Sequence, residues 1–144
     1  MNTVLFSSKT DLWSTPQFLF DKLNDEYHFT LDVCALPNNA KCALYYTPSD
    51  DGLLQSWSGH ICWCNPPYGH GIHKWIEKAY HESLHHTRIV MLLPARTDTK
   101  WFHDYILNKA QLTFIRGRLK FGNAINSAPF PSMLAYYNLS PVQL

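Results

Sequence analysis

Apolar residues follow two different spacings along this chain, and each spacing predicts one kind of secondary structure. Short continuous apolar runs bounded by turn-forming residues are typical of buried strands. We therefore predict strands at 29–34, 43–47, 61–64, 88–93, 112–115 and 133–137. The run at 88–93, RIVMLL, has the pattern of a central parallel strand that is covered on both faces.

Three other segments place apolar residues at the spacing of an amphipathic helix. The first is expected to begin with Thr15 as N-cap and Pro16 at the first helical position, and to continue to Tyr27. The second is predicted at 72–84 and the third at 97–107. A Pro- and Asp-containing stretch at 48–52 predicts a turn.

Strands that alternate with helices predict an α/β fold, in three layers around a mostly parallel sheet. At 144 residues the chain is expected to form a single domain, residues 1–144. Ligands of such sheets bind beyond the carboxyl ends of the strands. Asp32, Asp50, Asp51 and Asn65 fall at or just after predicted strand ends, so we expect a ligand site there.

Composition and charge narrow the class of protein. Hydrophobic residues make up 46% and charged residues 16%, which indicates a globular chain. No apolar run approaches the ~20 residues of a membrane span, and the N-terminus lacks the pattern of a signal peptide, so we expect a cytoplasmic protein without a membrane partner. The net charge of +1 is uneven: residues 1–51 hold seven acids and three bases, whereas 96–144 hold six bases and two acids. This asymmetry suggests two ligands of opposite charge.

The cysteines at 34, 42, 62 and 64 do not have the spacing of a zinc site. We expect buried free thiols and no metal.

The stretch Asn65-Pro66-Pro67-Tyr68 carries the most specific chemistry in the sequence. An exocyclic amine conjugated to a purine ring is a weak nucleophile, because its lone pair is delocalised. The Asn65 side-chain oxygen and the Pro66 carbonyl could each accept one N–H and localise that lone pair, while Pro66 and Pro67 restrict the backbone that carries these oxygens. Tyr68 could stack on the face of the ring.

Several ordered motifs give the chain a resemblance to a known family from about Trp13 to Tyr137. They are Trp13-Ser14-Thr15-Pro16, Leu31-Asp32-Val33-Cys34-Ala35, Asp50-Asp51-Gly52-Leu53, Trp57, Asn65-Pro66-Pro67-Tyr68-Gly69, Trp75-Ile76-Glu77-Lys78-Ala79, Leu92-Leu93-Pro94-Ala95-Arg96-Thr97-Asp98-Thr99, and Gly117-Arg118-Leu119-Lys120-Phe121 with Ala128-Pro129. The chain resembles the small phage-type, Dam-like DNA N6-adenine methyltransferases of the S-adenosylmethionine-dependent, Rossmann-like class. The resemblance implies a Rossmann-like fold and identifies Asn65, Pro66, Pro67 and Tyr68 as the catalytic motif.

The resemblance also implies that the pocket for the cofactor, S-adenosylmethionine, is bordered by Trp13, Thr15, Pro16 and Asp32. Asp32 would accept a hydrogen bond from the cofactor's amino group or from a water, and Asp50 or Asp51 could meet its adenine amine. Many such enzymes have a glycine-rich loop after the first strand, but the sequence here is Asp32-Val33-Cys34-Ala35-Leu36-Pro37. We therefore expect the cofactor to depend more on Trp13 to Pro16 and on Asp32.

Together these features predict transfer of a methyl group to N6 of a flipped-out adenine in DNA, without a metal. Contacts to DNA are expected from the basic residues of the last third, Arg96, Lys100, Arg116, Arg118 and Lys120. The same motif would also suit an enzyme that methylates RNA adenine, a protein glutamine or cytosine N4, although cytosine N4 enzymes more often begin it with Ser.

A remote alternative is a zinc peptidase, because His81-Glu82-Ser83-Leu84-His85 matches the H-E-x-x-H pattern. These residues end an amphipathic helix, where histidines also suit the helix dipole without any metal. A binding-only module that holds cofactor or DNA without transfer is the third possibility, and the intact Asn-Pro-Pro-Tyr motif argues against it.

Overall fold

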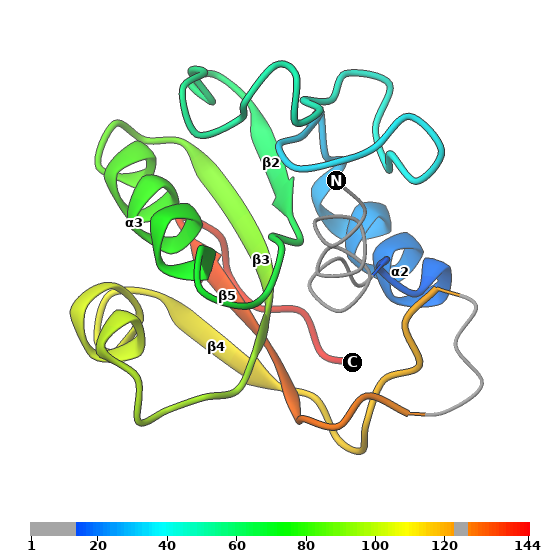
Figure 1. The fold of residues 1–144 in the computed structure, drawn as a ribbon, viewed down its shortest axis with the longest axis vertical. Helices are drawn as coiled ribbons and strands as arrows, with labels where there is room; N and C mark the ends of the chain where they lie inside the picture. Colours follow the sequence, from blue (N-terminus) through cyan, green and yellow to red (C-terminus); the bar gives the residue numbers. More distant parts are fainter. Residues whose placement is uncertain (1–13, 123–126) are drawn as a thin grey trace.

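A mixed α/β structure with one five-stranded sheet is seen in the computed structural model, which describes residues 14–122 and 127–144 (Figure 1). Among these residues the elements follow in the order α2 (Gln17–Tyr27), β1 (Leu31–Asp32), β2 (Ile61–Cys64), α3 (Ile72–Ser83), β3 (Arg88–Pro94), the π-helix η1 (Phe102–Ile106), β4 (Gln111–Phe114) and β5 (Ser132–Tyr137). The α/β class predicted from the sequence is confirmed.

The order of strands in the sheet is β1-β2-β3-β5-β4. β1, β2 and β3 pair in parallel, whereas β5 is antiparallel to both β3 and β4. Of these five described strands, four therefore run in one direction and β5 is reversed, so the prediction of a mostly parallel sheet holds. Because β1 to β4 share a direction, the segments that follow their carboxyl ends gather at one edge of the sheet.

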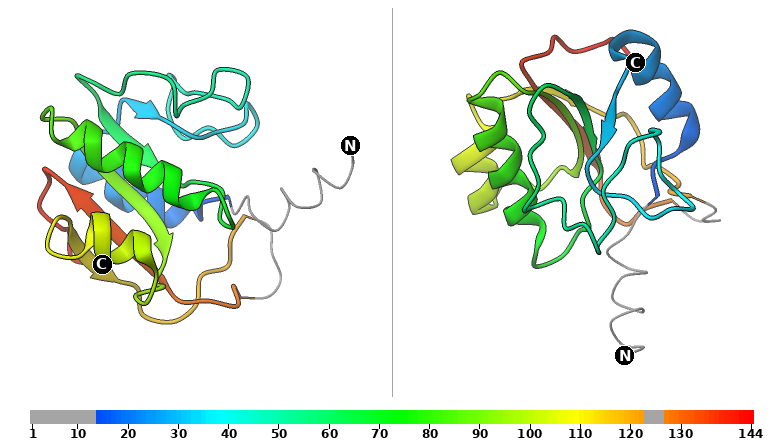
Figure 2. Two further views of the ribbon diagram at one scale, coloured as in Figure 1. Left: turned by 60° about the vertical axis from the view of Figure 1, so that its left-hand side comes forward. Right: turned by 90° about the horizontal axis from the view of Figure 1, so that it is seen from above.

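Helices cover both faces of the sheet (Figure 2). On one face, Phe20 of α2 packs edge-on against Trp63 of β2, with 5.6 Å between ring centroids. On the other face, Tyr80 of α3 contacts Tyr137 of β5 and Tyr105 of η1. Successive residues of a strand point to opposite faces, which explains why β2, β3 and β5 read as almost uninterrupted apolar runs: both sides are buried.

Several predicted elements differ from the observed ones, among them the predicted strand at 29–34, which is reduced to β1 (Leu31–Asp32). The first helix begins at Gln17, so Pro16 takes the N-cap position and the Thr15 side chain makes no cap hydrogen bond. The predicted strand at 43–47 is reduced to one bridge between Tyr45 and Asp32. The predicted helix at 97–107 is shorter, because residues 97–99 form a turn in which the Thr99 hydroxyl accepts a hydrogen bond from the Phe102 amide.

All four cysteines, each within the described residues, are free thiols. Cys62 and Cys64 are buried as predicted, but Cys34 and Cys42 are only partly buried. Among the described residues, none of the helices is both long and apolar enough to span a membrane.

Candidate active site

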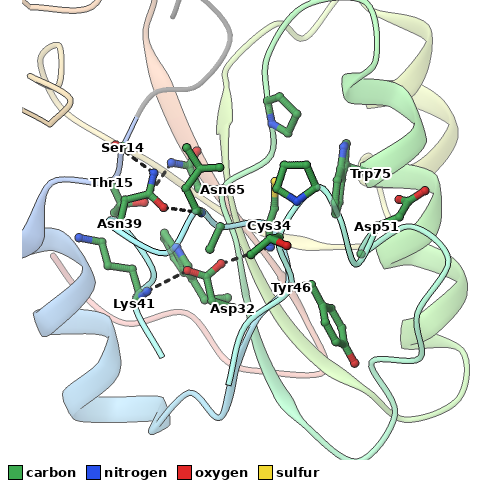
Figure 3. A pocket seen from close by; sticks show the side chains of 17 residues that line it. Ser14, Thr15, Asp32, Cys34, Asn39, Lys41, Tyr46, Asp51, Asn65 and Trp75 are labelled. Carbon is green, nitrogen blue, oxygen red and sulfur yellow. Dashed lines mark hydrogen bonds between the residues drawn. The ribbon is translucent and has the colours of Figure 1, made fainter. Parts of the chain in front are cut away.

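A cavity of about 340 Å³ lies beyond the carboxyl ends of β1 and β2 (Figure 3). Its walls come from the segment before α2, the loop after β1, the turn after β2 and one residue of α3. The lining residues are Ser14, Thr15, Asp32, Cys34, Ala35, Leu36, Asn39, Lys41, Tyr46, Thr47, Pro48, Asp51, Gly52, Trp63, Asn65, Pro67 and Trp75. The predicted strand-end site is therefore a real cavity.

Asp32 is the last residue of β1 and is only 2% exposed. Its Oδ1 accepts a hydrogen bond from the Cys34 amide at 3.3 Å and its Oδ2 accepts one from the Lys41 amide at 3.0 Å. Desolvation raises the pKa of Asp32 to about 6, although these two amides act in the opposite direction. Asp32 thus fixes the loop after β1, and its buried carboxyl group is part of the cavity wall.

The catalytic candidate Asn65 lies directly after β2, on the wall of the cavity. Its side-chain Nδ2 donates a hydrogen bond to Thr15 Oγ1 at 3.0 Å. Trp63 and Asn65 are two residues apart in an extended segment, so both face α2. This register brings Asn65 to the segment before α2 rather than to α3.

One end of the cavity carries polar side chains that can bind an anion or a zwitterion (Figure 3). Among the described residues, Lys41 is the only basic one in the lining, and its Nζ donates to Gln17 Oε1 at 2.6 Å. Partial desolvation lowers the pKa of Lys41, and the nearby Asp32 carboxylate opposes this effect. Asn39 donates from Nδ2 to Ser14 Oγ at 3.4 Å and accepts a hydrogen bond from the Leu36 amide at 2.7 Å.

The other end of the cavity is aromatic, with Trp75 and Tyr46 beside Asp51 (Figure 3). Trp75 stacks on the fully buried Trp57, whose indole N–H donates to the Gly52 carbonyl at 2.9 Å. A Cβ atom at Gly52 would lie 2.2 Å from the Val33 carbonyl oxygen and 3.1 Å from the Trp75 ring. Only glycine fits at this point, where the turn passes directly against the loop after β1.

Tyr68, which the sequence predicts to stack on a substrate ring, does not line this cavity. It is 3% exposed, its hydroxyl donates to the Leu92 carbonyl of β3 at 3.2 Å, and its ring packs edge-on against Phe121 and Phe130. Burial raises the pKa of Tyr68 well above its usual value. Tyr68, Phe121 and Phe130 form an aromatic cluster. Of these three residues, Tyr68 lies three positions after Asn65 in the sequence.

The structure separates the other predicted site residues into two groups. Thr15, Asp32, Asp51, Asn65 and Pro67 line the cavity, whereas Pro16, Asp50 and Pro66 do not. Asp50 is exposed and its carboxylate accepts hydrogen bonds from the Thr47 amide and hydroxyl at 2.8 and 3.1 Å, so it stabilises the 48–52 turn. Trp13 lies outside the described residues.

The predicted nucleic-acid residues Arg96, Lys100, Arg116, Arg118 and Lys120 are all exposed. Arg96 and Lys100 follow β3, and the other three follow β4, so they belong to the same edge of the sheet as the cavity. Arg96 lies 5.7 Å from the Phe130 ring and Arg118 donates to the Ala128 carbonyl at 3.5 Å. Arg96 therefore adjoins the aromatic cluster, and Arg118 contacts the segment that precedes Phe130.

The H-E-x-x-H pattern has a structural role. Glu82 accepts hydrogen bonds from the Trp57 amide at 3.1 Å and from Lys78 at 2.9 Å. Within residues 14–122 and 127–144, no group of three or more His, Cys, Asp or Glu side chains is arranged to hold a metal ion.

Several cavity residues were not identified from the sequence, above all Asn39, Lys41, Tyr46 and Trp75. The spacing around Trp75 indicates only the apolar face of a helix. Lys41 had a usable signal, because it is the only lysine or arginine between Lys22 and Lys74, in an acidic part of the chain.

The model of the family described as DNA N-6-adenine-methyltransferase (Dam) matches residues 2–132. The chain is similar to the DNA N-6-adenine-methyltransferase of Haemophilus phage HP1 (strain HP1c1), with 34% identity over 119 residues that cover 81% of this chain and 69% of that protein. It is also similar to the DNA N-6-adenine-methyltransferase of Escherichia phage T1, with 34% identity over 112 residues that cover 76% of this chain and 46% of that protein.

Proposed function

The chain belongs to the DNA N-6-adenine-methyltransferase (Dam) family, whose reaction is methylation of adenine N6 in DNA, and we propose that the cavity holds S-adenosylmethionine as the methyl donor. The observation that carries this proposal is the position of Asn65, which lies on the wall of a cavity that also contains Asp32 and Lys41. The resemblance drawn from the sequence motifs is confirmed at the level of the family.

The chemistry of the lining fits this cofactor. A volume of about 340 Å³ is within the range of small-molecule sites. S-adenosylmethionine has a zwitterionic amino-acid end, for which Asp32 and Lys41 offer a carboxylate and an ammonium group. Its nucleoside end has an aromatic base and ribose hydroxyls, for which Trp75, Tyr46 and Asp51 offer stacking surfaces and a carboxylate. When bound, the cofactor supplies an electrophilic methyl group on a sulfonium.

Asn65 and Pro66 activate the attacking nitrogen in this proposal. The Asn65 side-chain oxygen and the Pro66 carbonyl accept the two N–H groups of the adenine amine, so its lone pair is less delocalised into the ring. Pro66 and Pro67 hold these oxygens in place before the reaction, which reduces the reorganisation required in the transition state. We assign the face of the flipped-out adenine to Tyr68, which is buried against Phe121 and Phe130 in this structure and must become accessible when the base enters.

DNA binds, in this proposal, along the edge of the sheet where Arg96, Lys100, Arg116, Arg118 and Lys120 follow β3 and β4. Arg96 lies beside the aromatic cluster and Arg118 contacts Ala128, two residues before Phe130, so phosphate contacts there would bring a nucleotide close to Asn65. Contacts of this kind give an affinity that falls steeply with salt.

We further propose that the whole chain is one methyltransferase domain with a Rossmann-like, three-layer fold. The family match over residues 2–132 and the helices on both faces of the sheet support this. As both relatives described above are phage enzymes, we also propose that the protein acts on DNA in the cytoplasm of a phage host.

The decisive experiment uses S-adenosylmethionine with a labelled methyl group. The protein is incubated in parallel with DNA, RNA and a protein extract, and the methylated atom is identified by mass spectrometry of the digested products. We expect N6-methyladenine in DNA. Label only in RNA, only in glutamine or only at cytosine N4 would contradict the proposed substrate, and absence of label from every substrate would contradict methyl transfer itself.

A further inference from the structure

Thr15 and Asn65 are separated by 50 residues in the sequence and meet at the wall of the cavity. The Asn65 Nδ2 donates to Thr15 Oγ1 at 3.0 Å, and Thr15 is 5% exposed. Sequence patterns predict two other roles for Thr15, as a helix cap and as a cofactor contact. The first is excluded, because Pro16 and not Thr15 takes the N-cap position of α2.

A side-chain amide has an oxygen at one end and an NH₂ group at the other, with nearly the same shape. The proposed function, on which this inference rests, requires the oxygen to face the adenine amine. If the amide turned over, it would present N–H donors to a group that is itself a donor. We propose that Thr15 is a positioning residue, which anchors Asn65 by its nitrogen and so keeps its oxygen, which is buried in this structure, on the side away from Thr15 for the substrate amine.

Thr15 and Asn65 lie on two segments that are held together by the packing of α2 on β2. Phe20 of α2 packs on Trp63, two residues before Asn65. Pro16 fixes the backbone after Thr15, and its carbonyl accepts hydrogen bonds from the Leu19 and Phe20 amides at 3.1 and 3.2 Å.

The backbone on the other side of Thr15 is also held, because the Ser14 carbonyl accepts a hydrogen bond from the Gly122 amide at 2.8 Å. Thr15 is thus supported from both sides, and its hydroxyl is in a fixed position relative to the amide. A fixed acceptor is what an orienting contact requires.

The first test is independent of activity. Thr15→Val removes the acceptor with little change in shape, and Thr15→Ser keeps it. In the protein without cofactor, the Asn65 NH₂ signal is identified in ¹⁵N NMR spectra by its loss in Asn65→Asp. We expect slow exchange of these protons with solvent in the wild type and in Thr15→Ser, and fast exchange in Thr15→Val. Equally slow exchange in Thr15→Val would overturn the anchor.

The second test separates positioning from a direct cofactor contact. Thr15→Val is expected to lower kcat by about tenfold to a hundredfold, the effect of losing one buried hydrogen bond, while the Kd of S-adenosylmethionine changes by less than about twofold. Thr15→Ser should retain most of kcat. An unchanged kcat in Thr15→Val, or a raised Kd with kcat intact, would overturn the inference. If the NMR result holds and the wild type methylates nothing, the anchor stands and the proposed function fails.

Discussion

The two halves of this protein contribute different things to one edge of the sheet. Among the described residues, every one that lines the cavity lies between Ser14 and Trp75. The predicted DNA contacts all lie after β3, in a segment with six bases and two acids. In the proposed function the first half supplies the cofactor site and the second half supplies the DNA surface, and the two lie at one edge of the sheet because β1 to β4 share one direction. Asn65 lines the cavity, and Tyr68 belongs to the aromatic cluster that Arg96 contacts.

The largest effect on kcat is expected from a substitution at Asn65. Asn65→Ala removes one of the two proposed acceptors for the adenine amine, so kcat should fall by about a thousandfold. Because Ala leaves Asp32, Lys41 and Trp75 in place, the Kd of S-adenosylmethionine should stay near that of the wild type. Steady-state methylation and calorimetry measure the two quantities, and near-normal kcat would remove Asn65 from the mechanism.

A substitution at Asp32 tests the proposed cofactor binding by the first half of the chain. Asp32→Asn should weaken the binding of S-adenosylmethionine by about tenfold to a hundredfold, because a buried charge-assisted contact is lost. The pKa of Asp32 is raised to about 6, so the ionised form that attracts a cation is lost as the pH falls through 6. Wild-type affinity, measured from pH 5 to 8, should therefore weaken below about pH 6, and the variant should show a much smaller change.

The same shift has a consequence for stability without cofactor. The folded state binds the Asp32 proton more tightly than the unfolded state, in which the carboxyl group has its ordinary pKa of 3.8. The contribution of Asp32 to the free energy of unfolding is therefore greatest at low pH and decreases as the pH rises from about 4 to about 6. A stability profile of the wild type minus that of Asp32→Asn that rises over this window would contradict the assignment.

Substitutions at two glycines test the packing of the cavity wall. Gly52→Ala places a Cβ 2.2 Å from a backbone oxygen, which should lower the free energy of unfolding by about 1–3 kcal/mol and displace Trp75. Gly71→Ala is the matched control, because no atom of the described residues, apart from its chain neighbours, lies within 4 Å of its Cβ position. Chemical denaturation measures both, and equal stability of the two variants would show that the contact at Gly52 relaxes freely.

The smallest effect is expected in the second half. Arg118→Ala should reduce DNA affinity severalfold and lower the slope of log affinity against log salt by about 1. Cofactor affinity should not change. Lys22→Ala, which removes an exposed base in the acidic half, is the control and should leave the salt slope unaltered. If both substitutions change the salt slope equally, the assignment of DNA binding to the second half of the chain is wrong.

The sequence determined much of the fold because local chemistry decides it. Apolar runs marked β2, β3 and β5, since strands buried on both faces have no polar positions. The stiff prolines and the amide at Asn65, between a predicted strand and a predicted amphipathic helix, indicated a candidate catalytic motif, which remains a prediction. The predicted 43–47 strand failed for the opposite reason: its residues favour extension, but they make only one bridge within the described part of the chain, to Asp32.

Only the tertiary structure decided which side chains share the site. Asp50 and Asp51 are adjacent and chemically identical, yet Asp51 lines the cavity while Asp50 caps a turn. The sequence predicts Thr15 as a helix cap, whereas in the structure its hydroxyl accepts a hydrogen bond from Asn65, 50 residues away in the sequence. Lys41 enters the cavity because the loop after β1 is fixed by the Asp32 carboxylate. Sequence pattern specifies what a residue can do, whereas its partners depend on contacts between segments tens of residues apart, and no local pattern contains those distances.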